Sequence, residues 1–204
     1  MDYFKLRPGY LVTPLLLIAN CLVFIALVLV SQSFSQFHSL TLLKFGANYS
    51  GLVEQGQIWR LLSSVFLHLS VTHLLFNSVS LVILGRFIEP LLGTTAFIGV
   101  YIAAGIAGSM ASYLFNPGVL SAGASGAIFG LFGVFIAILL GKMIRPDVRN
   151  AWAKNIATIL ILNLGMGFIL PVDNAAHIGG LLTGIVLGLL LVPLMKKRLL
   201  RHLL

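Results

Sequence analysis

Charge is scarce in this sequence. Of 204 residues, 13 are Lys or Arg and 5 are Asp or Glu, so that charged residues make up 9% of the chain. A soluble domain carries roughly 25% charged residues, so the composition excludes an ordinary soluble globular domain. It also excludes a disordered chain, which is poor in apolar residues and rich in charge.

Cysteine is almost absent. The single residue, Cys21, excludes a disulfide framework within one chain, and because it lies in an apolar run we interpret it as a packing residue. The first apolar segment is long enough to span a membrane, and no small-residue cleavage site follows it. We therefore expect no cleavable signal peptide.

Apolar residues make up 59% of the chain, and the few charges divide it into long uncharged runs. A transmembrane helix needs about 20 apolar residues, so the composition suggests about six spans and leaves little room for a second domain. Asn116-Pro117-Gly118, a turn signal, divides the longest run into two spans. We predict an all-α membrane bundle forming one domain over residues 1–204, with helices near 13–30, 64–86, 94–115, 125–142, 154–171 and 175–195.

The distribution of basic residues predicts the orientation of these helices. With the N-terminus inside, eleven Lys or Arg residues fall on the inner side and only Lys44 and Arg60 on the outer side. This positive-inside bias predicts a multi-pass protein of the cell membrane with both termini in the cytoplasm. The net charge of +8 is then a signal of topology and of contact with anionic lipid, and no nucleic-acid partner is expected. Arg86 and Glu89 are interpreted as an inner-surface pair that helps to end the second helix.

Residues 31–63 form a connection longer than ordinary loops, and it is rich in apolar residues. We predict an outer segment that is partly embedded in the membrane interface; the alternative is a cap that packs only on protein. Trp59-Arg60 is interpreted as an interfacial anchor, with Trp at headgroup level and Arg60 available to phosphate.

Polar residues inside membrane helices are costly, and each suggests a function. His73 and Asn77 lie four residues apart on the second predicted helix, Ser125 opens the fourth, and His177 lies near the start of the sixth. A rise of about 1.5 Å per residue places all four in the outer half of the membrane. A serine and a histidine at matching depth suggest a nucleophile and its general base.

Glycine spacing indicates how Ser125 and His177 could approach each other. Small residues on one face let two membrane helices pack closely, and we therefore expect the fourth and sixth predicted helices to be partners. The glycines in question are Gly126, Gly130 and Gly133 on the fourth helix, and Gly180, Gly184 and Gly188 on the sixth.

Together these residues resemble the rhomboid intramembrane serine proteases, over about residues 59–188. The motifs occur in the family's order, and six spans with both ends inside is the family's basic bacterial form. The matching motifs are Trp59-Arg60, His68 with His73-x-x-x-Asn77, Glu89-x-x-x-Gly93, Gly123-Ala124-Ser125-Gly126, and Ala176-His177 followed by Gly180-x-x-x-Gly184.

The resemblance implies a Ser125–His177 dyad that cleaves single-span or otherwise membrane-anchored proteins near the outer end of their membrane helix. The substrate helix must unwind, because an intact helix shields its carbonyl groups. The active site then opens to the outside, where a polar hollow would supply water. Neither a cofactor nor a metal is implied.

The resemblance also assigns supporting roles. Asn77, His73 and the backbone N–H of Ser125 would stabilise the oxyanion, and Gly123 and Gly126 would allow a tight turn and close substrate approach. Phe129 would stack on the catalytic histidine, and His68 would fix the first loop or hold water. We expect no carboxylate as a third catalytic residue beside Ser125 and His177. Asp173, the one carboxylate near His177 in sequence, is placed at the outer surface.

Two other functional classes are less consistent with the sequence. A metal or ion transporter using His68, His73 and His177 would need carboxylates inside the helices, and these are missing. A rhomboid-like protein that binds membrane clients without cutting them typically lacks the nucleophile or the base, whereas this chain keeps both.

Overall fold

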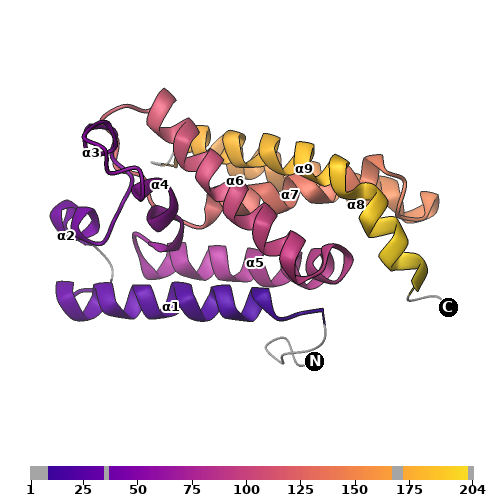
Figure 1. Cartoon of the computed structure of the whole chain (residues 1–204), viewed down its shortest axis with the longest axis horizontal. Coiled ribbons are helices and arrows are strands. Elements are labelled where there is room, and N and C mark those ends of the chain that lie inside the picture. Colours follow the sequence, from indigo (N-terminus) through magenta and orange to yellow (C-terminus); the bar gives the residue numbers. More distant parts are fainter. Residues whose placement is uncertain (1–8, 35–36, 167–171, 202–204) are drawn as a thin grey trace.

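The computed structural model describes residues 9–34, 37–166 and 172–201. This part of the chain consists of helices and connecting segments and contains no β-strand (Figure 1). Six longer helices form the bundle, and four short helical segments lie between the first two of them. In chain order the elements are α1 (Val12–Ser31), α2 (Ser39–Lys44), α3 (Ser50–Glu54), α4 (Arg60–Ser63), the 3₁₀ helix η1 (Ser64–Phe66), α5 (Val71–Leu92), α6 (Thr94–Phe115), α7 (Ser125–Leu140), α8 (Pro146–Met166) and α9 (Asn174–Arg201).

The predicted fold class, an all-α membrane bundle, is confirmed. Within the described residues, α1, α5, α6 and α9 are long and apolar enough to cross a membrane, and α7 is apolar but shorter. The described part of α8 carries Asp147, Arg149 and Lys154, and the predicted fifth span, 154–171, ends among residues 167–171, outside the described part. Six spans therefore remain a prediction.

The second helix is shifted from its predicted bounds of 64–86. Residues 64–66 form η1, and α5 begins at Val71 because the Ser70 side chain accepts a hydrogen bond from the backbone N–H of His73, which caps the helix. At its other end α5 continues to Leu92, because the carboxylate of Glu89 is buried and does not mark a membrane boundary.

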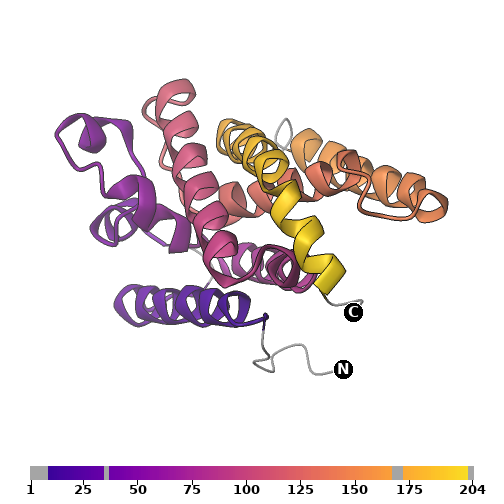
Figure 2. The same cartoon turned by 45° about the vertical axis from the view of Figure 1, so that its right-hand side comes forward.

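Helix α7 lies at the centre of the bundle and is buried on most of its surface, packed against α6 and α9 (Figures 1 and 2). The predicted pairing of α7 with α9 is confirmed by their glycines. A methyl group added to Gly180 would collide with the carbonyl of Gly126, and one added to Gly184 would collide with the carbonyl of Gly130. The two backbones are thus in direct contact, which only glycine permits at these positions.

Glu89 joins α5 to the start of α1. Its carboxylate accepts hydrogen bonds from the backbone N–H groups of Leu11 and Val12, both at 2.6 Å, and of Thr13 at 2.9 Å, and from the Thr13 hydroxyl at 2.7 Å. The first N–H groups of a helix have no hydrogen-bond partner within the helix. A carboxylate at this end also interacts favourably with the positive end of the helix dipole. Glu89 is therefore the cap of α1, and the interpretation that it lies at the inner surface was wrong because its side chain is completely buried.

Arg60 holds together the connection of residues 31–63, called the first loop below. Its guanidinium donates to the carbonyls of Leu43 at 2.7 Å and Ala47 at 3.0 Å and to the Gln57 side chain at 2.8 Å, and it lies 4.6 Å from the ring centroid of Trp59. The side chain is buried, and burial lowers its pKa from the usual arginine value. The prediction that Arg60 faces phosphate was wrong, because its side chain is buried and its Nε and Nη1 groups donate within the loop.

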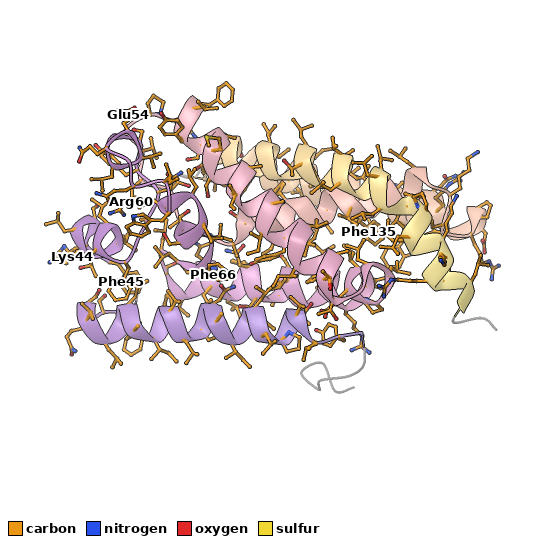
Figure 3. The ribbon with its side chains drawn as sticks, in the orientation of Figure 1. Lys44, Phe45, Glu54, Arg60, Phe66 and Phe135 are labelled. Carbon is orange, nitrogen blue, oxygen red and sulfur yellow. The ribbon has the colours of Figure 1, made fainter. Side chains whose placement is uncertain are left out.

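The remainder of the first loop keeps an apolar surface. Figure 3 shows its short helices alongside one end of the bundle, where Lys44, Phe45 and Glu54 are labelled. Its exposed large apolar side chains are consistent with the predicted interfacial position. They are Phe34, Leu40, Ile58, Trp59 and Leu62.

Candidate functional site

The first turns of α5 hold His73 and Asn77 in fixed positions. The backbone N–H of His73 donates to the Ser70 hydroxyl at 3.1 Å, and the Asn77 amide nitrogen donates to the His73 carbonyl at 3.0 Å. The backbone N–H of Leu69 donates to Nδ1 of His73 at 3.5 Å. Because Nδ1 accepts this bond, the proton of a neutral ring is on Nε2.

The absence of a side chain at Gly123 lets the His73 ring lie beside the start of α7. Its φ of +144° is one that side-chain-bearing residues rarely adopt, and a methyl group there would lie 2.6 Å from Cε1 and 2.9 Å from Nε2 of His73. The same methyl position is 3.6 Å from the Ser125 hydroxyl oxygen. The missing side chain of Gly123 thus leaves the space in which the His73 ring approaches Ser125.

His177 is buried and lies against Phe129, one turn after Ser125 on α7. The two rings are stacked, with centroids 4.1 Å apart and planes 7° from parallel. Next to them, a methyl group on Gly126 would lie 3.4 Å from the carbonyl oxygen of Ala176. The residues directly adjacent to Ser125 and His177 in sequence therefore pack closely, which places the starts of α7 and α9 side by side.

Within this site the Ser125 hydroxyl and the His177 ring are not joined by a hydrogen bond. Nδ1 of His177 is buried and has no hydrogen-bond partner among the described residues. In enzymes without substrate, catalytic hydrogen bonds are often long and tighten when substrate binds. The absence of this hydrogen bond therefore leaves the pairing of Ser125 with His177 a prediction.

Asp173 fixes the start of α9 from the outside of the site. Its Oδ1 accepts from the Asn116 amide at 2.8 Å and from the backbone N–H of Ala176 at 3.1 Å, and its carbonyl accepts from the backbone N–H of His177 at 3.1 Å. Asp173 thus caps α9 and ties it to the end of α6. The Asn116 contact joins residues 57 positions apart and had no signal in the sequence.

The segment before Ser125 is held by the first loop. The backbone N–H of Gly123 donates to the Ser64 carbonyl at 2.9 Å, and Asn48 and Ser121 exchange two backbone hydrogen bonds of 2.9 Å. The Asn48 side chain also donates to the Ser109 carbonyl of α6 at 2.8 Å. These contacts attach the segment before Ser125 to residues 48 and 64, and no pattern in the sequence indicated them.

His68 lies behind His73 and is completely buried. The two rings meet edge to face, with centroids 5.3 Å apart. Burial, with the nearby His73, lowers the pKa of His68 to about 3, so the ring stays neutral. Both of its ring nitrogens are buried without a hydrogen-bond partner in the described part of the chain, and its predicted role in fixing the first loop or holding water stays a prediction.

The described residues contain no cluster of three or more His, Cys, Asp or Glu side chains that could hold a metal ion. His68 and His73 are adjacent, but no carboxylate or cysteine joins them in such a cluster. The side chains named above carry a hydroxyl on Ser125, an amide on Asn77 and imidazole rings on His68, His73 and His177.

Comparison with known proteins identifies the family. The Rhomboid domain model matches residues 55–194. The chain is 44% identical over 145 residues to Rhomboid protease GluP of Bacillus subtilis (strain 168), covering 71% of this chain and 28% of that protein. It is 38% identical over 154 residues to RHOMBOID-like protein 5 of Arabidopsis thaliana (74% and 50%), and 37% identical over 148 residues to YdcA of Bacillus subtilis (72% and 73%).

The match spans about half or less of the first two of these relatives. The Rhomboid domain match, from residue 55 to residue 194, includes α5 to α8 and most of α9, the helices that carry His73, Asn77, Ser125 and His177. Family assignment and the sequence motifs therefore agree, and the chain belongs to the rhomboid family.

Proposed function

We propose that this chain is an intramembrane serine endopeptidase in which Ser125 is the nucleophile and His177 the general base. The observation that carries the proposal is the stack of His177 on Phe129, one turn from Ser125, beside the contact of Gly126 with Ala176. The name of the relative GluP, a rhomboid protease, supports the same reaction. Residues 1–204 act as one membrane domain.

In the first step the Ser125 oxygen attacks the carbonyl carbon of the scissile peptide bond while His177 takes the hydroxyl proton. The C–N bond then breaks, and His177 gives the proton to the leaving amine. Water next attacks the acyl-enzyme with His177 again as base, which releases the carboxylate product and restores Ser125. Stacking on Phe129 holds the plane of the imidazole, and Asp173 caps α9 through Oδ1.

The oxyanion of the tetrahedral intermediate is stabilised by His73, Asn77 and the backbone N–H of Ser125. The hydrogen bond from Leu69 to Nδ1 of His73 supports this role, because it leaves Nε2 as a donor on the side of Gly123 and Ser125. Asn77 lies one turn further along the same face of α5. A methyl group on Gly126 would face the Ala176 carbonyl and Gly108, so this glycine serves the close packing of α7 on α9 and α6.

The substrates are single-span or otherwise membrane-anchored proteins, cut near the outer end of their membrane helix. Ser125, His177 and His73 all lie in the first turns of their helices, at one end of the bundle. The positive-inside bias makes this the outer end, in a multi-pass protein of the cell membrane with cytoplasmic termini. The start of α1 and the end of α9 lie together at the opposite end (Figures 1 and 2).

The experiment is cleavage of a single-span model protein by the chain purified in detergent. Ser125→Ala and His177→Ala are expected to abolish cleavage. The matched controls are Ser39→Ala and His38→Ala, two exposed residues of the first loop, which are expected to leave cleavage unchanged. EDTA is expected to have no effect. Unchanged cleavage by the Ser125 or His177 variant would exclude the dyad, and inhibition by EDTA would indicate a metal-dependent reaction.

A further inference from the structure

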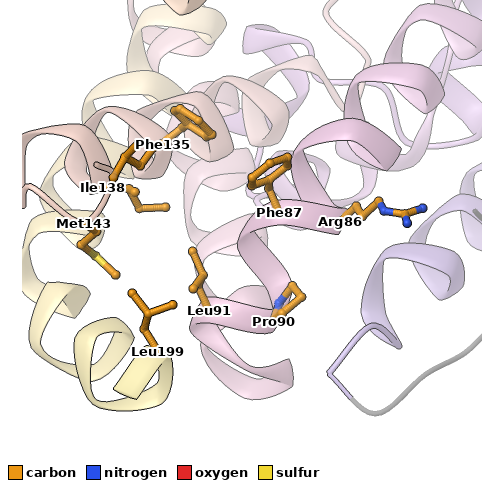
Figure 4. Close-up of a pocket in the computed structure, with 9 residues that line it drawn as sticks. Arg86, Phe87, Pro90, Leu91, Phe135, Ile138, Met143 and Leu199 are labelled. Carbon is orange, nitrogen blue, oxygen red and sulfur yellow. The ribbon is translucent and has the colours of Figure 1, made fainter. Parts of the chain in front are cut away.

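An apolar pocket lies at the end of the bundle opposite the proposed active site. Its volume is about 410 Å³, and α5, α7, the turn after α7 and α9 contribute its walls (Figure 4). Ile138, in its wall, lies about 20 Å along α7 from Ser125 at the usual helical rise. Apolar side chains form most of the lining, among them Phe87, Leu91, Phe135, Ile138, Met143 and Leu199.

Neither water nor a polar ligand suits this space. A water molecule needs two to four polar partners, which these walls do not offer, although the pocket far exceeds the ~30 Å³ of a water molecule in the liquid. Arg86 borders the pocket, but Figure 4 shows its guanidinium directed away from the cavity. The chemistry of the walls therefore fits a hydrocarbon chain.

Arg198, next to the pocket residue Leu199, supplies a charge at this end. Its guanidinium packs directly on Gly93, two residues after the pocket residue Leu91, where an added methyl group would collide with it. The Nε of Arg198 is buried and has no hydrogen-bond partner in the described part of the chain. A buried guanidinium nitrogen without an acceptor is costly and is best satisfied by an anionic oxygen.

The described carboxylates are all engaged or placed elsewhere. Glu89 accepts its hydrogen bonds from the start of α1, Asp147 pairs with Arg145 at 2.8 Å, and Asp173 caps α9 at the opposite end. Glu54 lies in the first loop (Figure 3). None of the carboxylates in the described part of the chain is therefore assigned to Arg198.

We propose that this pocket binds an anionic phospholipid, with one acyl chain in the cavity and the phosphate on Arg198. The pocket accounts for the hydrocarbon, and the arginine accounts for the charge. In the orientation proposed above, the lipid belongs to the cytoplasmic leaflet, where anionic headgroups meet basic residues at helix ends. The site is separate from the proposed active site, so its test does not depend on proteolysis.

Native mass spectrometry of the detergent-purified chain tests the proposal with phosphatidylglycerol and phosphatidylcholine of the same acyl chains. Phosphatidylglycerol is expected to bind at least about tenfold more tightly, and Arg198→Gln to remove that preference, as expected for loss of a charge-assisted phosphate contact. Lys197→Gln is the control, because Lys197 is exposed and the net charge changes equally. Equal binding of the two lipids, or an equal effect of both substitutions, would overturn the proposal.

The hydrocarbon part of the site is tested by filling it. Leu91→Trp is expected to weaken phosphatidylglycerol binding about tenfold, whereas Leu190→Trp, on a 71% exposed side chain of α9, leaves it unchanged. Unchanged binding in the Leu91 variant would place the lipid elsewhere.

A measurement that avoids changes in the pocket uses Trp152, which stacks on the pocket residue Phe135. Trp59→Phe leaves Trp152 as the single tryptophan, and brominated phosphatidylglycerol in detergent is expected to quench it more strongly than brominated phosphatidylcholine. Equal quenching by the two lipids would contradict a specific anionic site even if the pocket variants failed to fold.

Discussion

Phe129 and His177 stack almost in parallel, with centroids 4.1 Å apart and planes at 7°, and they join the first turns of α7 and α9. The contact fixes the imidazole plane without a hydrogen bond to a carboxylate. Since Phe129 has no hydroxyl, it acts on His177 through its ring alone.

Replacing Phe129 by Leu is expected to lower kcat about tenfold while leaving KM nearly unchanged, because the histidine loses its orientation and substrate contacts remain. Phe97→Leu is the matched control, since Phe97 is a completely buried ring of the core on α6. Cleavage kinetics and thermal unfolding of both variants provide the measurement. Equal losses of kcat would show that general packing, and not the stack, accounts for the effect.

Gly123→Ala is expected to lower activity by about a hundredfold, the effect of removing one oxyanion donor. The added methyl group would displace the His73 ring, and φ of +144° is unfavourable for alanine. Gly118→Ala serves as control, because Gly118 also has a positive φ, +81°, but has no neighbour within 4 Å of the added methyl group. Similar activity of the two variants would contradict placement of His73 by Gly123.

Glu89→Ala is expected to destabilise the fold by about 3 kcal/mol, because several buried N–H groups at the start of α1 lose a charged acceptor. Glu54→Ala, on an exposed side chain, should change stability by less than about 0.5 kcal/mol. Unfolding in mixed micelles measures both. A Glu89 variant as stable as the Glu54 variant would show that water replaces the cap at no cost.

His68 is expected to make the fold sensitive to acid. Its pKa is lowered to about 3 in the folded chain, against about 6.5 when unfolded, so the unfolded state binds more protons between these values. Stability therefore falls as pH decreases below about 6.5, by about 2 kcal/mol at pH ~5 from this residue.

The free energy of unfolding is measured at pH ~7 and pH ~5 for the unchanged chain, for His68→Gln and for His38→Gln. His38 serves as the control because its side chain is exposed. The loss of stability between the two pH values should be smaller in the His68 variant than in the unchanged chain, and the same as in the unchanged chain for the His38 variant. Parallel curves for all three proteins would mean that His68 does not carry the effect.

Much of this organisation could be predicted from the sequence. The α7–α9 contact followed from glycine spacing, because small residues at helical intervals have one main use in a membrane bundle. The matching depth of Ser125 and His177 followed from uncharged runs and helical rise.

Glu89 and Arg60 could not be placed in this way. Charges mark membrane boundaries in a sequence, so both were assigned to surfaces, whereas both are buried on backbone groups. The partners of Glu89 lie 76 to 78 positions away, and no local pattern specifies them. Contacts between a side chain and distant backbone require the folded chain to be known.

The central claim is that Ser125 is a nucleophile activated by His177, and covalent labelling tests it most directly. Incubation of the purified chain with a fluorophosphonate, followed by mass spectrometry of its peptides, is expected to find the phosphonyl group on Ser125. His177→Ala should reduce labelling at least about a hundredfold, and His38→Ala should leave it unchanged. Labelling elsewhere while Ser125 remains unmodified, or unchanged labelling without His177, would contradict the account.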